Sequence, residues 1–235
     1  LRVFSTIFAI IIFYNSLYHI TKEIIMDNLR TLFAEKLLKI EAIKVQPNNL
    51  FTWASGWKSP FYCDNRQTLS YPDIRRFVKL EMAHAILKHF HNVDAIAGVA
   101  TAGIPQGALV AEELGLPFCY VRSKPKDHGL ENLIEGKLKE GSNVVVIEDL
   151  ISTGGSSLKA VEALRRSGAN VVGMVAAFTY GFDVAQQAFD SANVPLVTLT
   201  DYEHVVAKAL EIGYIKENDI ALLDSWRSNP SEFGK

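Results

Sequence analysis

Two adjacent carboxylates follow an apolar run in the middle of the chain, and small hydroxyl residues and glycines come directly after them. The stretch Val144–Ser157 reads VVVIEDLISTGGSS. Burying Glu148 and Asp149 side by side is costly unless other groups satisfy their charges. The hydroxyls of a sugar can do this as donors, and so can a divalent cation. The pair therefore indicates a site for a polyhydroxy ligand or a metal.

The residues after the pair have the composition of a phosphate-binding loop. Gly154 and Gly155 let the backbone approach a ligand closely. The first N–H groups of the helix that we predict for Ser156–Ser167 favour an anion. Carboxylates for a diol, followed by a phosphate cradle, match the span of a ribose 5-phosphate. Ordinary helix capping and a solvated acidic pair are the alternatives that these residues alone leave open.

Apolar strands and amphipathic helices alternate around this stretch. The alternation predicts an α/β fold with a mostly parallel central sheet and helices on both faces. In such sheets, ligands bind beyond the carboxyl ends of the strands, which is where we expect the acidic pair. The predicted strands are Asp94–Val99, Phe118–Arg122, Asn143–Ile147, Asn170–Phe178 and Leu196–Leu199. The predicted helices are Ile104–Leu114, Ser156–Ser167, Phe182–Ala192 and Asp201–Ile212.

Three further segments complete the expected organisation. Residues Phe51–Asp64 mix aromatic and small residues and suggest a hairpin-like element. The run Ser70–Asp73 is a helix start with Pro72 just inside it, and this helix should end near Phe90. The polar stretch Ser123–Leu138 predicts a long irregular loop, which in a compact domain is usually functional or disordered.

The composition suits one globular domain. The chain has 235 residues, 49% of them hydrophobic, and a formal net charge of −2. No bulk electrostatic field therefore calls for nucleic acid or an anionic membrane as a partner. Cys63 and Cys119 have neither metal-binding spacing nor a disulfide framework. We expect a protein of the reducing cytoplasm.

The first 25 residues form an apolar leader that stands apart from this domain. Its apolar run is shorter than the roughly 20 residues that span a bilayer, and no signal-peptide cleavage site follows. We expect the phosphate-binding domain to occupy residues 26–235 and the leader to be non-native or disordered; a membrane anchor and an extra ordered helix are the alternatives. Asp27 or Asn28 is a plausible N-cap, with Leu29, Leu32, Phe33 and Leu37 as the apolar stripe of the first helix.

The acidic pair and its loop resemble the phosphoribosyl pyrophosphate motif of type I phosphoribosyltransferases. Three other stretches narrow the resemblance to orotate phosphoribosyltransferases. Phe51–Arg66 is similar to the N-terminal signature of that family, Gly98–Pro105 to its pyrophosphate-binding turn, and Arg122–Gly129 to its mobile catalytic loop. They occur in the family's order and spacing.

The resemblance implies a type I phosphoribosyltransferase fold with a small N-terminal hood. It implies transfer of ribose 5-phosphate from phosphoribosyl pyrophosphate to orotate, which gives orotidine 5′-phosphate and pyrophosphate for UMP biosynthesis. Asp149, Lys126 and His128 would be the catalytic residues. Phosphoribosyl pyrophosphate would bind Thr101, Ala102, Gly103, Arg122, Lys126, His128, Glu148, Asp149, Leu150, Ile151, Ser152, Thr153, Gly154, Gly155 and Ser156. Orotate would bind Ser152, Lys58 and Tyr62.

The resemblance also implies a cofactor and a partner. Mg²⁺ would be held mainly by the substrate pyrophosphate and water, with no set of protein side chains as its ligands. A homodimer is implied, in which the loop Ser123–Leu138 reaches the partner's site. No nucleic acid or membrane partner is expected, and association with a downstream decarboxylase stays open.

The sequence departs from the family where basic residues are common. Ala54, Ala102, Ser123 and Tyr180 stand at four such positions. Lys58, Lys124 and Arg66 are candidates to compensate. Two alternative functions stay open, namely a type I phosphoribosyltransferase for another base and a non-catalytic regulator that senses phosphoribosyl pyrophosphate.

Overall fold

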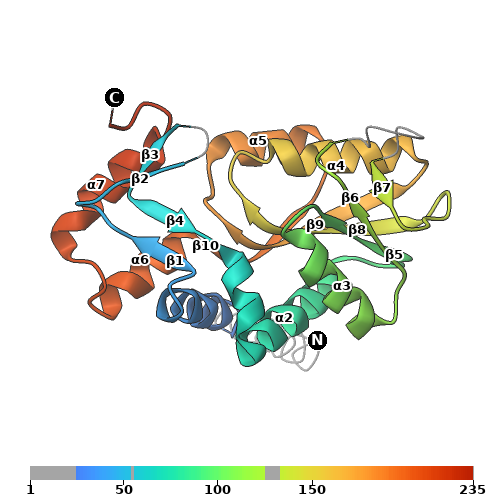
Figure 1. Cartoon of the computed structure of the whole chain (residues 1–235), viewed down its shortest axis with the longest axis horizontal. Helices are drawn as coiled ribbons and strands as arrows, with labels where there is room; N and C mark the ends of the chain where they lie inside the picture. Colours follow the sequence, from blue (N-terminus) through green and yellow to red (C-terminus); the bar gives the residue numbers. More distant parts are fainter. Residues whose placement is uncertain (1–24, 54–55, 125–132, 235) are drawn as a thin grey trace, which may run out of the picture.

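A twisted, mostly parallel sheet forms the centre of the molecule (Figure 1). The computed structural model describes residues 25–53, 56–124 and 133–234. Within them, six strands form the sheet in the order β10-β9-β8-β5-β6-β7. Neighbouring strands run parallel except β7, which is antiparallel to β6. The strands are β5 (Ala95–Val99), β6 (Phe118–Val121), β7 (Ile134–Glu135), β8 (Asn143–Ile151), β9 (Asn170–Thr179) and β10 (Leu196–Asp201).

The strand order reverses beside β5. The chain proceeds from β5 to β6 on one side, and then returns with β8 to the other side. In open α/β sheets, the crevice at such a reversal is the usual ligand site. The carboxyl ends of β5 and β8 therefore mark the part of the molecule to inspect for function.

Helices cover both faces of the sheet, as the sequence predicts. One apolar cluster joins helices α2 and α3 to one face through Val78, Met82 and Val110. A second cluster joins α4 and α5 to the other face through Val161 and Phe189. The bounds are α2 (Pro72–His89), α3 (Gly103–Leu114), α4 (Gly155–Arg166), α5 (Asp183–Ser191), α6 (Tyr202–Glu211) and α7 (Glu217–Ser228).

Two short antiparallel strand pairs build the hood that the family resemblance implies. Strand β1 (Ile43–Val45) pairs with β4 (Phe61–Cys63), and β2 (Phe51–Thr52) pairs with β3 (Lys58–Ser59). The short helix η1 (Asn65–Ser70) then leads from the hood into α2. The hood lies beside α6 and α7 (Figure 1).

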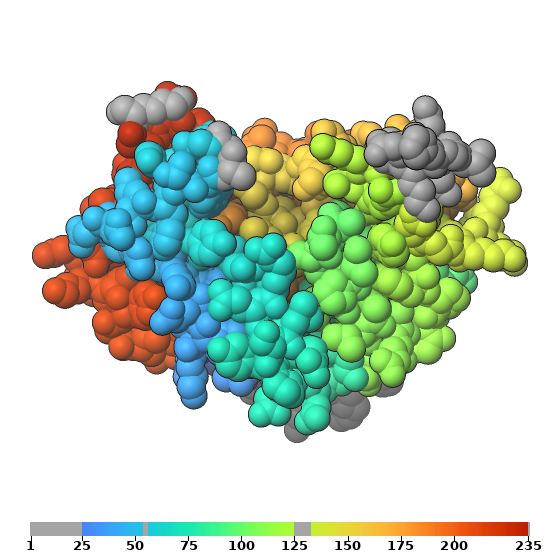
Figure 2. Space-filling model, viewed as in Figure 1, coloured from blue at the N-terminus to red at the C-terminus, as the bar shows by residue number. Residues whose placement is uncertain are grey.

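An aromatic cluster fixes the hood and α7 to the end of β9. The indole of Trp226 in α7 lies 6.2 Å from the ring of Phe61 and 5.8 Å from that of Tyr180. The ring of Phe61 also stacks on Phe178 at 5.8 Å. Since aromatic pairs of this kind add to the area that they bury, the hood is held firmly over the carboxyl ends of the strands. Figure 2 shows the surface hollowed between the cyan hood and the green α3 region.

Several predicted boundaries were wrong. Strand β8 runs on to Ile151, so Glu148 and Asp149 lie inside it and not behind it. The reason is that β9 continues to pair with β8 up to Ile151 and Thr179, beyond the end of β5. Strand β10 likewise extends to Asp201.

The N-terminal part also needs correction. Residues 25–39 are helical, so the helix has already begun before Asp27 and Asn28, which are not its N-caps. Phe33 and Leu37 are buried as predicted, but Leu32 is 41% exposed. Residues 1–24, which are all of the predicted leader except Ile25, lie outside the described part of the chain. No helix in the described part is long and apolar enough to cross a membrane.

Candidate active site

The acidic pair occupies the centre of the crevice. Glu148 is only 5% exposed, and both of its carboxylate oxygens accept hydrogen bonds. Ser157 Oγ donates to Oε2 at 2.9 Å, and the backbone N–H of Asp149 donates to Oε1 at 3.0 Å. Burial, followed by the negative charge of Asp149, raises the pKa of Glu148 well above its ordinary value. Burial also raises the pKa of Asp149. The pair is thus poised to gain from ligand hydroxyls or a cation.

The loop after β8 presents an open helix N-terminus. Gly154 is the N-cap of α4, with a φ of 80° that favours glycine, and a Cβ there would meet the ring of Phe189 at 2.8 Å. No side chain of the described residues caps this helix end. The first N–H groups of a helix have no partner within the helix, so they are available here to an anion.

A second turn faces this loop from the end of β5. The peptide bond between Ala100 and Thr101 is cis. A Cβ added at Gly103 would lie 2.5 Å from the carbonyl oxygen of Ile147, and one added at Gly98 would lie 2.7 Å from the carbonyl oxygen of Gly103. Only glycine therefore lets this turn pack directly against β8.

The two turns and the acidic pair enclose one cavity of about 290 Å³. It brings together the acidic pair with Thr101, Ala102, Leu150, Ser152, Thr153, Gly154 and Ser156 from the predicted phosphoribosyl pyrophosphate site. Its other lining residues are Val99, Ala100 and Ser157. Ile151 is fully buried in β8, and Gly103 packs beneath the turn.

The basic residues of the predicted catalytic loop are only partly described. The guanidinium of Arg122 lies 3.6 Å from the carboxylate of Glu135, and the backbone N–H of Arg122 donates to Leu133 O at 2.8 Å. Lys126 and His128 lie outside the described residues. The predicted irregular stretch ends earlier than expected, because residues 134–135 form β7.

Two of the predicted orotate ligands do not line this cavity. Lys58 Nζ donates to Thr52 Oγ1 at 2.8 Å within the β2–β3 hairpin. Tyr62 is 37% exposed, and its ring lies 5.4 Å from that of Phe51. Ser152 alone of the three lines the cavity.

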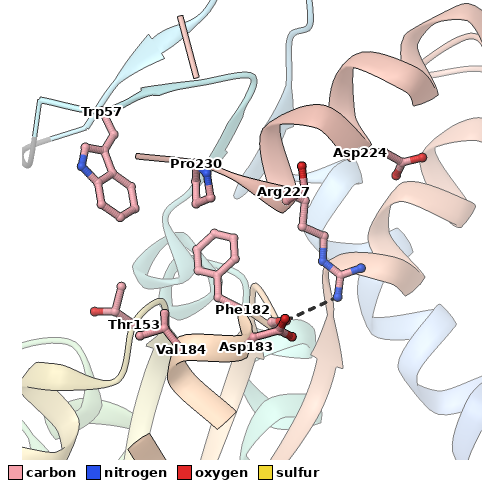
Figure 3. Close-up of a pocket in the computed structure, with 10 residues that line it drawn as sticks. Trp57, Thr153, Phe182, Asp183, Val184, Asp224, Arg227 and Pro230 are labelled. Atoms are coloured by element: carbon pink, nitrogen blue, oxygen red, sulfur yellow. Dashed lines mark hydrogen bonds between the residues drawn. The ribbon is translucent and has the colours of Figure 1, made fainter. Parts of the chain in front are cut away.

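A larger cavity of about 480 Å³ adjoins the first one at Thr153 (Figure 3). Trp57 of the hood, Phe182 before α5 and Arg227 of α7 border it. Arg227 donates to Glu203 at 2.9 Å and to Gly181 O at 3.4 Å. The remaining lining residues are Gly181, Asp183, Val184, Asp224, Ser228 and Pro230. Two carboxylates and one already paired guanidinium give this cavity no surplus of positive charge.

Sequence reasoning missed a contact from η1 to the acidic pair. Asn65 Nδ2 donates to the backbone carbonyl oxygen of Asp149 at 2.6 Å, across 84 positions of the chain. Beside it, Arg66 Nε donates to Asp64 Oδ1 at 2.6 Å, so the Asp64-x-Arg66 motif forms an ion pair. The Asp64-x-Arg66 motif drew attention to this segment of the sequence. Residue spacing alone could not indicate that the side chain of Asn65 would reach Asp149.

The fold and this site define the class of protein. Residues 73–209 match the model of the phosphoribosyl transferase domain. The chain is 70% identical to orotate phosphoribosyltransferase from Bacteroides thetaiotaomicron over 208 residues, which cover 88% of this chain and 98% of that relative. It is 63% identical to orotate phosphoribosyltransferase from Porphyromonas gingivalis over 209 residues, covering 89% of this chain and all of that relative (100%).

A solved structure agrees. The crystal structure of orotate phosphoribosyltransferase from Aeropyrum pernix superposes with a TM-score of 0.68 at 28% identity, covering 77% of this chain and 98% of that chain. The chain belongs to the orotate phosphoribosyltransferase family.

Proposed function

We propose that this protein is an orotate phosphoribosyltransferase, which joins N1 of orotate to C1 of phosphoribosyl pyrophosphate and releases pyrophosphate. The observation that carries the proposal is the shared cavity, in which the Glu148–Asp149 pair lies between the β5 turn and the phosphate-binding loop. The product, orotidine 5′-phosphate, would serve UMP biosynthesis. We also propose a cytoplasmic location, where the free thiols of Cys63 and Cys119 would stay reduced.

The carboxylates would hold the ribose. The leaving of pyrophosphate places positive charge on the ribose ring, and two carboxylates beneath it stabilise that charge electrostatically. The pKa of each carboxyl is raised first of all because burial disfavours its charged form. Residues 152–156 would take the 5-phosphate, and the turn Thr101–Gly103 would take the pyrophosphate through backbone N–H groups.

Mg²⁺ is the cofactor that we propose, and the donor set fits it. Both oxygens of Glu148 already accept hydrogen bonds from the protein. Among the described residues, no group of three or more His, Cys, Asp or Glu side chains gathers to hold a metal ion. A cation bound mainly by substrate oxygens and water, with Asp149 near it, suits this arrangement. The ion would neutralise charge on the leaving pyrophosphate.

We propose that Ser152, Lys58 and Tyr62 contact orotate, with Ser152 the best supported because it lines the cavity. For Lys58 and Tyr62 the support is their position on the hood, which lies over the carboxyl ends of the strands. Their side chains would have to turn toward the ligand when it binds, because Lys58 now bonds Thr52.

We further propose a homodimer in which Arg122, Lys126 and His128 neutralise the leaving pyrophosphate, the last two in the partner's site. The family resemblance supports this arrangement. The weak, 3.6 Å contact of Arg122 with Glu135 leaves that guanidinium able to exchange partners.

A substrate comparison tests the proposed function. Purified protein with Mg²⁺ and phosphoribosyl pyrophosphate should consume orotate, followed by its ultraviolet absorbance, and should not consume adenine or hypoxanthine. Turnover of a purine without turnover of orotate would reassign the base. Binding of phosphoribosyl pyrophosphate with no turnover of any base would favour a regulator.

A further inference from the structure

Strand β8 projects beyond its neighbour on one side. Its pairing with β5 ends at Gly98 and Ile147, whereas its pairing with β9 continues to Ile151 and Thr179. Past Ile147, no strand in the described part of the chain bonds the backbone groups of β8 that point toward the β5 side. Buried backbone groups nearly always find a partner, so side chains must serve this projecting edge.

Two side chains satisfy the backbone of Asp149 on this edge. Its N–H donates to Glu148 Oε1 at 3.0 Å, and its carbonyl oxygen accepts from Asn65 Nδ2 at 2.6 Å. In a parallel ladder, a strand continuing from β5 would have supplied such partners. The carboxylate of Glu148 and the amide of Asn65 therefore replace the missing stretch of strand.

Asn65 is well placed to fix the position of Asp149. Its side chain is buried, with 4% of the residue exposed. Its own backbone is held, because Thr68 Oγ1 donates to Asn65 O at 2.6 Å and the preceding Asp64 N–H donates to Ala42 O at 2.7 Å. The side-chain amide of Asn65 therefore links the segment between the hood and α2 to the backbone of Asp149.

Within the part of the chain that the structure describes, the side-chain amide of Asn65 is satisfied on one side only. Asn65 Oδ1 is buried and has no hydrogen-bond partner among the described residues. An unpaired buried acceptor is costly, and an apolar side chain would avoid that cost only by leaving the carbonyl oxygen of Asp149 without its donor. The cost of burying Oδ1 without a partner is explained if the Nδ2 donor has a function in holding Asp149.

We propose that Asn65 is a positioning residue, which holds Asp149 by its carbonyl oxygen so that the carboxylate faces the ribose. The proposal rests on the proposed function for the reaction, but it concerns a contact that exists before any ligand binds. Asn65 itself would not touch the reacting atoms, and its effect would pass entirely through Asp149.

A double-mutant cycle tests this directly. Asn65→Leu removes the donor at similar volume, and loss of one buried hydrogen bond at the site should lower kcat about tenfold. The affinity for phosphoribosyl pyrophosphate, measured by calorimetry without orotate, should fall a few-fold. In the Asp149→Asn background, Asn65→Leu should cost less than about twofold in kcat, because the group that it positions has already been disabled.

The matched control is Asn143→Leu, which removes the same kind of hydrogen bond, from Asn143 Nδ2 to Asn92 O at 2.9 Å, at the opposite end of β8. It should lower Tm while keeping kcat and the binding affinity within about twofold of wild type. Should Asn65→Leu not fold, Asn65→Ala provides the same comparison.

Equal kcat losses for Asn65→Leu in both backgrounds would overturn the positioning role and leave a structural one. An unchanged kcat and affinity would overturn it as well. Failure of the wild-type protein to turn over orotate would instead contradict the proposed function, and the calorimetric arm would still decide the role of Asn65.

Discussion

Glu148 is 5% exposed and its carboxylate lies beside that of Asp149, so its negative charge is costly to bury. Ser157 and the backbone of Asp149 offset part of this cost. Ligand hydroxyls or a cation would lower the remaining cost of the buried charge, and this gain would add to the binding free energy. Stability and ligand binding therefore make opposite demands on the same two residues.

Asp149→Asn should leave the fold intact and slow the reaction. The variant keeps the side-chain volume but loses one charge-assisted interaction with the ribose or the cation, worth roughly 1.5–3 kcal/mol. Turnover should fall on the order of 10- to 100-fold. Steady-state kinetics of orotate consumption measure this, and wild-type turnover in the variant would remove Asp149 from the mechanism.

In melts without added substrate, Glu148→Gln should stabilise the protein at alkaline pH. Because the folded-state pKa is raised, the stability associated with Glu148 is complete below the unfolded pKa of about 4.3 and is lost as pH rises through the higher folded value. Glutamine stays neutral and avoids that loss. Its Tm should exceed that of wild type at pH 8, with the gap narrowing toward pH 4.

The exposed Glu162 on α4 supplies the control, since Glu162→Gln makes the same change in net charge away from the site. Thermal melts followed by circular dichroism measure both variants. A wild-type protein more stable than Glu148→Gln at pH 8 would contradict the account of the buried charge.

Sequence alone predicted the acidic pair and the loop because their residue types are unusual at a strand end. It could not predict Asn65, whose role depends on where β5 stops beside β8. That stopping point follows from tertiary packing, since nothing in the run Val144–Ile151 marks the residue at which its neighbour ends.

At the scale of elements, glycines determine how closely the β5 turn approaches β8. Gly103→Ala should destabilise the protein by about 1–3 kcal/mol, because the added Cβ meets the backbone of Ile147, which cannot move aside. Gly155→Ala is the matched control: a Cβ there meets nothing within 4 Å, so its unfolding free energy should change by less than about 1 kcal/mol. Chemical denaturation compares them, and equal stabilities would contradict the packing argument.

His204 of α6 contacts the helix formed by residues 25–39. His204 Nδ1 lies 2.7 Å from Asp201 Oδ1, and Nε2 lies 2.9 Å from Asp27 Oδ1. Burial alone would lower the pKa of His204, but the hydrogen bonds to Asp201 and Asp27 outweigh it and raise the pKa. Arg30 also faces Asp201, at 2.9 Å, and its charge opposes protonation.

This histidine should make stability depend on pH. The contribution of protonated His204 is complete below the unfolded pKa of about 6.5 and is lost as pH rises through the higher folded value. Wild-type Tm should drop by a few degrees across that window, and His204→Gln should lack the drop. Melts at closely spaced pH values measure it, and parallel curves for the two proteins would refute the assignment.

Apolar runs predicted the central strands, which are buried on both faces, and amphipathic periodicity predicted helices such as α4. Helix α7 was missed, although it places Trp226 in the aromatic cluster and Arg227 at the larger cavity. Its sequence, Glu217–Ser228, is polar on most positions, so only the packing of Leu223 and Trp226 reveals its role. Strand β7 has two residues, which is too short for any alternation to show.

At the scale of the whole molecule, the proposed dimer makes a mixing experiment possible. An Asp149→Asn subunit mixed with a Lys126→Ala subunit should regain activity, because one of the two sites in each mixed dimer has neither defect. If subunits exchange at random, about half of the dimers are mixed, and recovery should approach roughly a quarter of wild-type activity per subunit.

The control mixes Asp149→Asn with the double variant carrying both substitutions, in which every site lacks Asp149 and no activity should return. Absence of recovery in the first mixture, with exchange confirmed by mass, would place the loop in its own subunit's site.

The central claim is that the Glu148–Asp149 cavity transfers ribose 5-phosphate to orotate, and a product balance tests it most directly. Purified protein with orotate, phosphoribosyl pyrophosphate and Mg²⁺ should form orotidine 5′-phosphate and pyrophosphate in equal amounts, quantified by mass spectrometry and by a phosphate assay coupled to pyrophosphatase. Asp149→Asn should form both products far more slowly and in the same ratio. Pyrophosphate release without orotidine 5′-phosphate, or no product from a folded protein that binds both substrates, would contradict the account.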